Sequence, residues 1–421
     1  MSGGATISGR AQWLNDPDLQ RLLAVLSEGG EEARIAGGAV RNTLLGEAVT
    51  DVDIATTNHP EETMRRAERA GMKAVPTGAE HGTITVVAGR RPFEVTTLRA
   101  DIETDGRRAK VAFGRDWKRD AERRDFTINA LYAEADGTVV DLVGGLADLE
   151  SRRLRFIGDA ETRIREDFLR ILRFFRFFAW YGSGRPDAEG LKASARLKEG
   201  LDRLSAERVW MELKKLLSAP DPSRALLWMR QTSVLTRVLP ETEKWGIDSI
   251  HPLTRAEGEL GWAADPLLRL MAMIPPDEER VAAMAARLKM STAETERLRR
   301  WARTPSVPAN ASEGDLAKLM YRAGRQAVLD RLRLSIASAR SSAGKGNGSD
   351  AGGRGTRLVA FAETWEQPRF PVSGKDLAAL GVAQGPGMGT LLSKLEDLWI
   401  QSGFELDRDA LLERAARDLN A

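Results

Sequence analysis

Runs of β-branched residues lie only before about Glu150, and this boundary constrains the fold of the chain more than any other feature of its sequence. Two short runs, Ala33–Ala36 and Thr50–Ala55, favour strands. Thr83–Ala88 and Phe93–Leu98 flank a Gly-Arg-Arg-Pro turn, which predicts a hairpin. The N-terminal part is therefore expected to be a small mixed sheet with helices.

Helical periodicity replaces the β pattern after Glu150. We therefore predict an α+β protein in which a small head precedes an all-helical remainder. The predicted helices are Ala39–Leu45, stopped by Gly46, and then Glu161–Tyr181, Ala206–Leu217, Ser223–Gln231, Glu278–Leu288, Thr292–Ala302 and Leu316–Ala337.

One segment, Ser341–Thr356, departs from this pattern because six of its sixteen residues are glycine and none has an apolar side chain larger than alanine. Such a composition buries too little apolar surface to offset the entropy lost on ordering. We therefore expect a flexible loop there.

The absence of cysteine excludes disulfides, thiolate metal sites and cysteine nucleophiles. The three histidines, His59, His81 and His251, lie far apart in the sequence, so metal chemistry would depend on carboxylates and favour a hard ion such as Mg²⁺. No apolar run reaches the ~18 residues of a membrane span. The opening MSGGATISGRAQW lacks the apolar core of a secretion signal, so we expect a cytoplasmic protein.

The most informative motif joins the double glycine Gly37-Gly38 to Asp51-Val52-Asp53. Because side chains alternate along a strand, Asp51 and Asp53 should share one face, where their repulsion favours a bound divalent cation. Glu94, on a neighbouring strand, would supply the third carboxylate of a two-magnesium nucleotidyl transfer. The glycines would let a triphosphate approach free N–H groups. The alternative is an ordinary polar strand face.

Two arginine motifs follow. Arg123 and Arg124 precede Asp125, which suits a helix N-cap, and two cations beside the positive end of a helix favour a bound phosphate. The alternative is a solvated basic turn. Over Arg107–Arg124, eight basic residues stand against three acidic ones, which is typical of nucleic-acid contact although the whole chain carries only +2.

The second arginine motif lies on the predicted helix Glu161–Tyr181, where steps of three residues form a ridge of charged side chains. An aspartate and an arginine fork can together hydrogen-bond the Watson–Crick edge of a base. A surface salt bridge is the alternative. The residues of the ridge are Asp167, Arg170, Arg173 and Arg176.

In this order, the motifs resemble those of the class II tRNA nucleotidyltransferases, the CCA-adding enzymes of the polymerase-β-like superfamily. The matching stretches are GGAVRN with DVD, HGT at His81–Thr83, RRDFTINA, DLVGGLADL at Asp141–Leu149, and EDFLRILR. The likeness is strong over residues 30–217. It is looser towards the C-terminus, where Ser373–Leu377 and Gly385–Gly389 resemble the family's tRNA-holding tail.

The resemblance implies roles for the matching residues. Asp51 and Asp53 would hold Mg²⁺, and Asp141 and Asp148 would lie in a hinge of the head. The nucleotide would be bound by Gly37, Gly38, Arg41, Arg123, Arg124, Asp167, Arg170, Arg173 and Arg176, with Asp167 and Arg170 reading the base. Ala206–Glu212 would position the base-reading helix. Asn42 stands where the family usually has aspartate, which removes a charge beside Arg41.

The resemblance also implies a reaction, in which the 3′-hydroxyl of tRNA attacks the α-phosphate of CTP or ATP and pyrophosphate leaves. Its partners would be tRNA, CTP and ATP, with no membrane contact and an oligomeric state left open. The implied segments are a catalytic head over 1–145, a helical neck over 146–217, a body over 218–340, the loop over 341–356 and a tRNA-binding tail over 357–421.

Several alternatives remain open: a poly(A) polymerase, an enzyme that adds only part of the CCA end, and an inactive RNA-binding relative. Thr77–Thr83 resembles the tRNA-specific branch rather than the poly(A) polymerases. The full-length segment Leu98–Glu122 argues against addition of CC alone but leaves an A-adding enzyme open. The intact pair Asp51 and Asp53 argues against an inactive protein.

Overall fold

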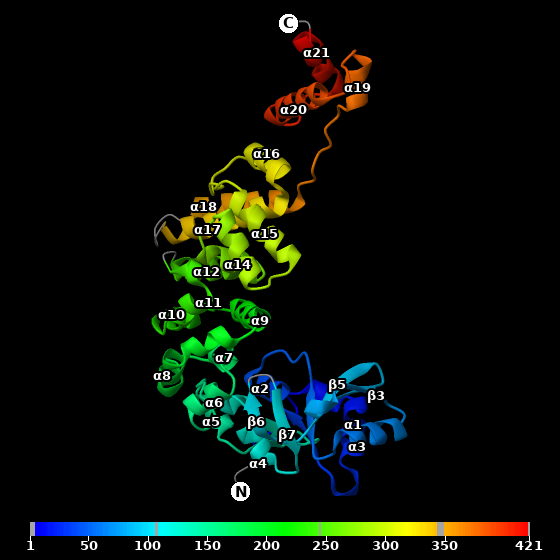
Figure 1. Ribbon diagram of the computed structural model, residues 1–421, viewed down its shortest axis with the longest axis vertical. Coiled ribbons are helices and arrows are strands. Elements are labelled where there is room, and N and C mark those ends of the chain that lie inside the picture. The colour runs from blue at the N-terminus through cyan, green and yellow to red at the C-terminus, as the bar shows by residue number, and fades with distance from the viewer. Residues whose placement is uncertain (1–4, 106–107, 244–245, 343–348, 420–421) are drawn as a thin grey trace. The chain divides into compact units, whose positions relative to one another are not determined.

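The computed structural model describes residues 5–105, 108–243, 246–342 and 349–419 (Figure 1). The chain divides into two compact units, Met1–Pro240 and Glu241–Ala421. This division is coarser than the five segments expected from the sequence, whose borders remain predictions. No helix in the described ranges combines the length and the apolar character needed to span a membrane.

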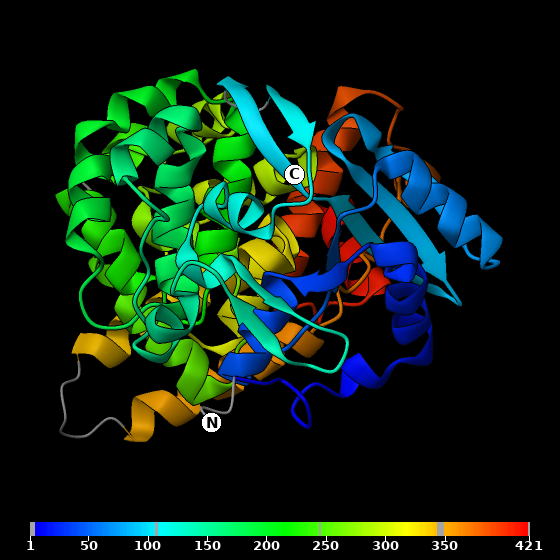
Figure 2. The same cartoon turned by 90° about the horizontal axis from the view of Figure 1, so that it is seen from below.

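A seven-stranded mixed sheet forms the centre of the head. Its strands are β1 (Ala33–Ala36), β2 (Asp53–Thr56), β3 (Lys73–Gly78), β4 (Thr83–Ala88), β5 (Arg91–Thr97), β8 (Leu131–Ala133) and β9 (Val139–Asp141), in the order β3-β4-β5-β2-β1-β8-β9. β2 and β5 pair in parallel, and the other neighbouring strands pair antiparallel. A separate ribbon of β6 (Arg99–Asp105) and β7 (Arg108–Phe113) is drawn in cyan in Figure 2.

The strands of the head follow the predicted pattern with two corrections. The bounds of β1 and β4 match the prediction, and β4 and β5 form the expected hairpin. β5, however, covers Arg91–Thr97 rather than Phe93–Leu98, so Arg91 and Pro92 belong to the strand and not to the turn. β2 begins at Asp53 rather than at Thr50, so Asp51 precedes the strand. Asp51 and Asp53 are nevertheless both exposed, whereas the rest of β2 is buried.

Helices cover the sheet and fix its strands. They are α1 (Pro17–Leu26), α2 (Gly38–Leu45), α3 (Pro60–Arg69), α4 (Trp117–Glu122) and α5 (Gly145–Glu150), with short 3-10 turns at Gln12–Asn15, Glu28–Gly30, Ala79–His81 and Thr127–Asn129. The side chain of Asp16 accepts hydrogen bonds from the first N–H groups of α1 and sets its start. α1 then buries its leucine face against α3 and β1.

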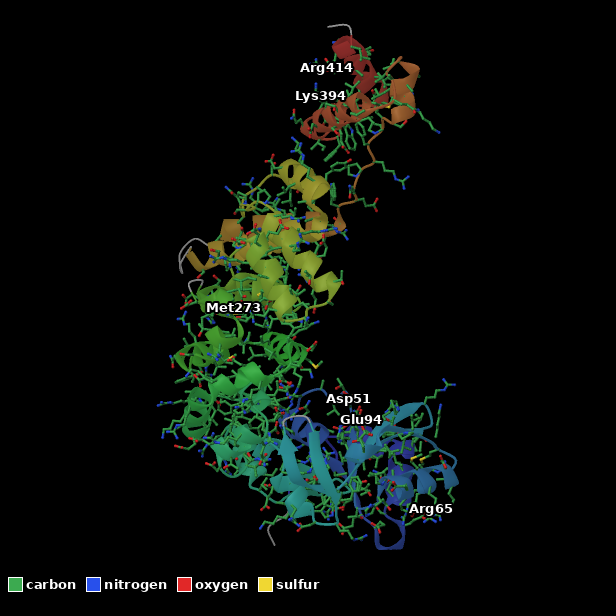
Figure 3. All side chains as sticks on the ribbon, viewed as in Figure 1. Asp51, Arg65, Glu94, Met273, Lys394 and Arg414 are labelled. Carbon is green, nitrogen blue, oxygen red and sulfur yellow. The ribbon has the colours of Figure 1, made fainter. Side chains whose placement is uncertain are left out.

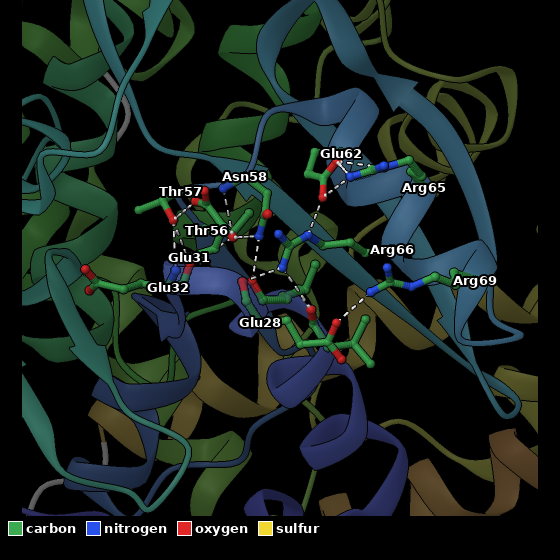
Figure 4. Close-up of polar contacts among 12 residues, drawn as sticks. Glu28, Glu31, Glu32, Thr56, Thr57, Asn58, Glu62, Arg65, Arg66 and Arg69 are labelled. Carbon is green, nitrogen blue, oxygen red and sulfur yellow. Dashed lines mark hydrogen bonds and ion pairs between the residues drawn. The ribbon is translucent and has the colours of Figure 1, made fainter.

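A polar network ties the end of β2 to α1 and α3 (Figure 4). Nδ2 of the buried Asn58 donates to the carbonyl of Leu26, 2.7 Å away. On α3, Glu62 pairs with Arg66 at 2.5 Å, and Nη1 of Arg66 donates to the carbonyl of Glu28 at 2.7 Å. The bond from Asn58 ties the chain just after β2 to the end of α1, and the bonds of Arg66 tie α3 to the turn that follows α1.

The first unit continues as helices after the sheet. They are α6 (Ala160–Glu166), α7 (Leu169–Tyr181), α8 (Ala188–Arg196), α9 (Ala206–Leu217), α10 (Ser223–Gln231) and α11 (Val234–Val238), with a 3-10 segment at Lys198–Arg203. The predicted bounds of α9 and α10 are confirmed. The prediction of one helix over Glu161–Tyr181 is wrong, because Asp167 has an extended backbone (φ −154°, ψ 110°) that separates α6 from α7.

Aromatic packing attaches α7 to the end of the head. The ring of Phe126 lies 4.9 Å from that of Phe156 and 5.3 Å from that of Phe177, centroid to centroid. Phe156 in turn stacks on Phe174 at 5.5 Å. Such contacts between large buried rings are among the strongest apolar interactions in a small domain. They hold the polar face of α7 beside the stretch that contains Arg123 and Arg124.

The second unit contains helices and connecting segments but no strand in its described residues. Its helices are α12 (Ile250–Leu260), α13 (Pro266–Met273), α14 (Glu278–Arg287), α15 (Thr292–Arg303), α16 (Glu313–Ala323), α17 (Arg325–Ser342), α18 (Ser349–Thr364), α19 (Gly374–Ala379), α20 (Pro386–Gln401) and α21 (Arg408–Leu419), with 3-10 turns at Pro240–Thr242 and Ile247–Ser249. α14 and α15 end within one residue of their predicted bounds. The predicted helix Leu316–Ala337 is instead two helices, because Gly324 (φ +88°) interrupts it.

The glycine-rich segment Ser341–Thr356 is not a continuous loop. Ser341 and Ser342 end α17, and Ser349–Thr356 forms the first half of α18, while residues 343–348 lie outside the described ranges. A Cβ atom at Gly355 would lie 3.1 Å from Cδ1 and Cγ1 of Ile336 on α17. Glycine at this position permits close packing of α18 against α17. The glycine-rich composition, which predicts a flexible loop, is therefore partly explained by helix packing.

Candidate active site

A tight glycine turn separates β1 from α2. Gly37 has a φ of +61°, which residues with a side chain rarely adopt. A Cβ atom there would lie 3.1 Å from the carbonyl oxygen of Asn129 and 3.2 Å from Nη1 of Arg124. Gly38 then begins α2, whose first N–H groups have no partner within the helix. The predicted glycine turn is therefore present, and Gly37 is the position that requires glycine.

Three carboxylates gather beside this turn. Asp53 on β2 is the register partner of Glu94 on β5, and Asp51 lies two residues before Asp53 (Figure 3 labels Asp51 and Glu94). Partial burial raises the pKa of Asp53, and the nearby charges of Glu94 and Asp51 raise it further, while Arg124 acts in the opposite direction. The parallel pairing thus brings the predicted acidic residues close enough for their charges to repel each other. None of these three acids makes an ion pair with a described basic residue.

These carboxylates do not enclose a metal ion by themselves. Over the described part of the chain, no three acidic or histidine side chains form a group that could hold one. The donors nevertheless fit Mg²⁺, which binds through one or two carboxylates together with waters and substrate phosphates. Burial first and the neighbouring carboxylates second raise the pKa of Asp53, and a bound divalent cation would stabilise its charged form.

Arg41 is a buried cation without a carboxylate partner. Its side chain is 7% exposed, and it makes no ion pair with a described residue. Nη2 donates to Oδ1 of Asn42 at 2.8 Å and to the hydroxyl of Tyr181 at 2.8 Å, and Nη1 donates to Oδ1 of Asn129. Burial lowers the pKa of Arg41. Asn42 therefore keeps the hydrogen bond to Arg41 but leaves its charge uncompensated.

The arginine pair after α4 is held by an aspartate that the sequence analysis did not single out. The buried Asp120 pairs with Arg123 at 2.6 Å and with Arg124 at 3.2 Å. Burial acts to raise the pKa of Asp120, but Arg123 and Arg124 outweigh it and lower that pKa. The spacing of three and four residues within one helical turn was the available signal for this contact.

Asp125 does not cap a helix, contrary to the prediction. Only a 3-10 turn, Thr127–Asn129, follows it, and no side chain caps that turn. Asp125 instead accepts a hydrogen bond from Nδ2 of Asn129 at 2.9 Å and pairs with Arg173 on α7 at 2.6 Å. These partners outweigh burial and lower the pKa of Asp125 to about 2.

The predicted ridge on α7 is divided by the break at Asp167. Asp167 pairs with Arg208 of α9 at 2.6 Å, whereas Arg170 bonds Glu166. The two expected base-reading residues are thus each held by a neighbour rather than by one another. Asp167 is not on the same helix as Arg170. The ridge of charged side chains predicted on one helix therefore begins only at Arg170.

Arg173 and Arg176 both approach Glu212, a buried residue of α9. The distance to Glu212 is 3.8 Å from Nη1 of Arg173 and 2.8 Å from Nε of Arg176. The stretch Ala206–Glu212, expected to position the base-reading helix, therefore does contact α7 through Arg208 and Glu212.

One cavity of about 530 Å³ collects most of the predicted residues. Of the predicted residues, Gly37, Gly38, Arg41, Asp53, Arg123, Arg124, Asp167, Arg170 and Arg173 line it. Asp125, Asn129, Leu169, Phe177 and Arg208, none of them among the predicted nucleotide-binding residues, also line it. Asp51 and Glu94 stand outside the lining, and Arg176 lines an adjoining cavity that shares Arg41 and Phe177. The volume falls within the range of pockets for molecules of nucleotide size.

Two family models match the chain: the poly A polymerase head domain over residues 33–155, and the probable RNA and SrmB-binding site of polymerase A over residues 186–245. The mitochondrial CCA tRNA nucleotidyltransferase 1 of mouse is 34% identical over 94% of this chain and 88% of that protein. The CCA-adding enzyme of Leuconostoc mesenteroides is 30% identical over 96% of both chains. The structure of the Bacillus stearothermophilus CCA-adding enzyme with CTP has a TM-score of 0.73 and 26% identity, covering 96% of this chain and 98% of that one.

Proposed function

The chain belongs to the CCA-adding tRNA nucleotidyltransferases, and on that premise we propose that its head adds C, C and A in turn to the 3′ end of tRNA. In each step the terminal 3′-hydroxyl of the RNA loses its proton and attacks the α-phosphate of CTP or ATP. The bond from the α-phosphate to the bridging oxygen breaks, and pyrophosphate leaves.

The observation that carries this proposal is a separation of uncompensated charge at one cavity. Asp53 and Arg41 line this cavity, and Asp51 and Glu94 lie near Asp53 outside the lining. The three acids make no ion pair with a described basic residue, and the buried Arg41 makes none with a described acid. Both sides would be neutralised together by a metal-bound triphosphate, which offers a cation to the carboxylates and phosphate oxygens to the guanidinium.

Asp51 and Asp53 would hold Mg²⁺, and Glu94 reinforces the negative field at Asp53. The bound ions would supply positive charge that favours loss of the hydroxyl proton and departure of pyrophosphate. Gly37 and Gly38 let the triphosphate reach the N-terminus of α2, where N–H groups can donate to it. Arg41, Arg123 and Arg124 pair with its oxygens.

Asp167 and Arg170 select the base in place of a nucleic-acid template. Asp167 offers acceptors and Arg170 offers donors at the rim of the same cavity, and together they match the edge of cytosine or adenine. The bonds that they make to Arg208 and Glu166 hold them in place before the nucleotide binds. Arg173 and Arg176 support this edge through Asp125 and Glu212.

The proposed hinge residues also have defined contacts. Asp141 accepts hydrogen bonds from the N–H groups of residues 143–146 and so caps the start of α5. Asp148 bonds Thr127 at 2.6 Å and Arg155 at 2.6 Å. These contacts link the end of the sheet to the stretch that bears Arg124, which supports a role in orienting the head between additions.

The direct test uses the purified chain with Mg²⁺, CTP and ATP and three tRNAs that end before the first C, after one C and after two. We expect each RNA to be completed to CCA and then to remain unchanged. Unlimited adenylation would instead favour a poly(A) polymerase, and extension of the third RNA alone would favour an A-adding enzyme. Binding of all three without extension would indicate an inactive relative.

The proposed compartment is the cytoplasm, supported by the cysteine-free composition. The mouse relative carries a mitochondrial name, so the two compartments are the alternatives. Fractionation of the native cells with immunodetection of the chain distinguishes them.

A further inference from the structure

A cavity of about 360 Å³ lies within the second unit, and the proposed reaction does not use it. Its walls come from the start of α12, the end of α13, α15 and α17. Leu253, Met271, Ile274 and Leu334 supply an apolar lining. This volume is at the lower end of the range for pockets that bind small organic molecules.

Arg331 of α17 places a cation at this cavity. Its Nε donates to the carbonyl oxygen of Trp301 at 3.0 Å, and its Nη2 donates to that of Ala302 at 3.2 Å. These carbonyls belong to the last turn of α15, so the guanidinium also meets the negative end of a helix. The guanidinium carbon lies 4.9 Å from the centroid of the Trp301 ring. Arg331 is therefore held in one place, and its Nη1 makes no hydrogen bond to a described residue.

The charge of Arg331 is not balanced by a carboxylate in the described part of the chain, and burial lowers the pKa of its guanidinium. Other buried or half-buried arginines of this unit are balanced. Arg269 pairs with Glu257 at 2.6 Å, Arg297 with Asp330 at 2.8 Å, and Arg333 with Glu363 at 2.6 Å. Arg331 therefore differs from those three arginines because, among the described residues, its partners are carbonyl oxygens and not a carboxylate.

A second donor in the cavity wall has no partner. Trp301 is only 1% exposed, and its buried Nε1 finds no acceptor in the described residues. A buried indole N–H normally finds an acceptor. Ser306 and Ser335 add hydroxyl groups to the lining, and the exposed Asp248 is the acidic residue in it.

We propose that this cavity binds a small organic anion, a carboxylate or a phosphate monoester with a compact apolar body. The anionic group pairs with Nη1 of Arg331 and accepts from the buried N–H of Trp301. The apolar body lies against Leu253, Ile274 and Leu334. Because no residue of this site takes part in the proposed nucleotide transfer, the two proposals stand or fall independently.

Calorimetric titration of the full-length chain tests this site, with phenyl phosphate and benzoate as probes and benzyl alcohol as the neutral counterpart. Saturating CTP with Mg²⁺ is present throughout, so that the nucleotide cavity is filled before the probes are added. We expect both anions to bind at one site in the millimolar range or tighter, and the alcohol to bind at least about tenfold more weakly.

Two variants and a matched control locate the binding. Arg331→Gln should weaken both anions by about tenfold or more, and Trp301→Phe, which keeps the ring but removes the N–H, by about threefold to tenfold. Arg333→Gln, two residues along α17 and paired with Glu363, should leave the affinity unchanged. Thermal melting confirms that each variant is folded.

The proposal is overturned if neither anion binds the unaltered chain at millimolar concentration, or if folded Arg331→Gln binds both as well as the unaltered chain does. Weaker tRNA binding by Arg331→Gln without any anion binding would assign Arg331 to an RNA phosphate, and that result would also overturn the small-molecule site.

Discussion

On the sheet side of the candidate active site, Asp51, Asp53 and Glu94 pair with no described cation, whereas on the helix side Arg123, Arg124 and Arg173 each pair with a carboxylate. The two sides therefore use charge differently. On the sheet side, charge is left for a ligand to neutralise. On the helix side, charge is balanced within the protein and also supports the fold. Substitutions on the two sides should separate loss of activity from loss of stability.

The largest effect is expected for Asp51→Ala. Loss of a proposed metal ligand should slow nucleotide addition by about a thousandfold or more. The melting temperature should hardly change, because Asp51 is exposed and its hydrogen bond in the described residues comes from the neighbouring Thr50. Single-nucleotide addition and thermal melting are measured on the same preparation. Glu47→Ala, an exposed acid outside the cavity, is the control, and near-normal turnover of Asp51→Ala would refute the metal assignment.

Arg173→Ala, in contrast, should reduce the stability of the fold. It leaves the buried Asp125 without its ion pair, which should lower the free energy of unfolding by about 3 kcal/mol. Urea unfolding followed by circular dichroism measures this loss. Adding Asp125→Asn should restore part of it, because the neutral side chain no longer needs a cation. A loss of only about 0.5 kcal/mol, typical of a surface pair, would show that the helix side is not stabilised in this way.

The same carboxylate predicts acid sensitivity. The pKa of Asp125 is lowered from 3.8 to about 2 in the folded chain, so its stabilisation is fully present above about pH 4 and is lost as the pH falls towards 2. The shift corresponds to about 2.5 kcal/mol. Urea midpoints measured between pH 5 and pH 2.5 should fall less steeply for Asp125→Asn than for the unaltered chain. Equal slopes would contradict the assignment to Asp125.

The smallest effect is expected for Arg170→Ala, which changes selectivity rather than turnover. Loss of its donors should reduce the preference for CTP over UTP by about tenfold, since one hydrogen-bonding group contributes about 1.4 kcal/mol. Competition between the two nucleotides at the first addition measures this ratio. Arg165→Ala, an exposed arginine of α6 paired with Glu161, is the control. An unchanged ratio would count against base selection by Arg170.

Local patterns predicted much of the fold. α9 and α10 keep their predicted bounds because the apolar stripe that marks a helix depends only on residues close together in the sequence. The break at Asp167 was missed because every residue around it suits a helix, and the extended backbone is accompanied by a bond to Arg208, 41 residues away. Helical periodicity contains no information about that partner.

In the candidate site, too, features that depend on short stretches of sequence were predicted, and contacts between distant residues were not. The glycine turn and the alternation around Glu94 follow from short stretches of sequence, and the structure has both. The contacts of Asp125 with Arg173 and of Arg41 with Tyr181 join residues 48 and 140 positions apart. A single sequence cannot specify such distant pairs, and for this reason Asp125 was interpreted as a helix cap.

The parallel pairing of β2 with β5 also determines when the acidic cluster can form. The chain between β2 and β5 passes through α3, β3 and β4, so Glu94 is synthesised well after Asp53. During synthesis, β1 and β2 can therefore pair before Glu94 adds its negative charge to that of Asp51 and Asp53. The pairing of β5 with β2 would then be the step of head assembly most sensitive to the supply of divalent ions.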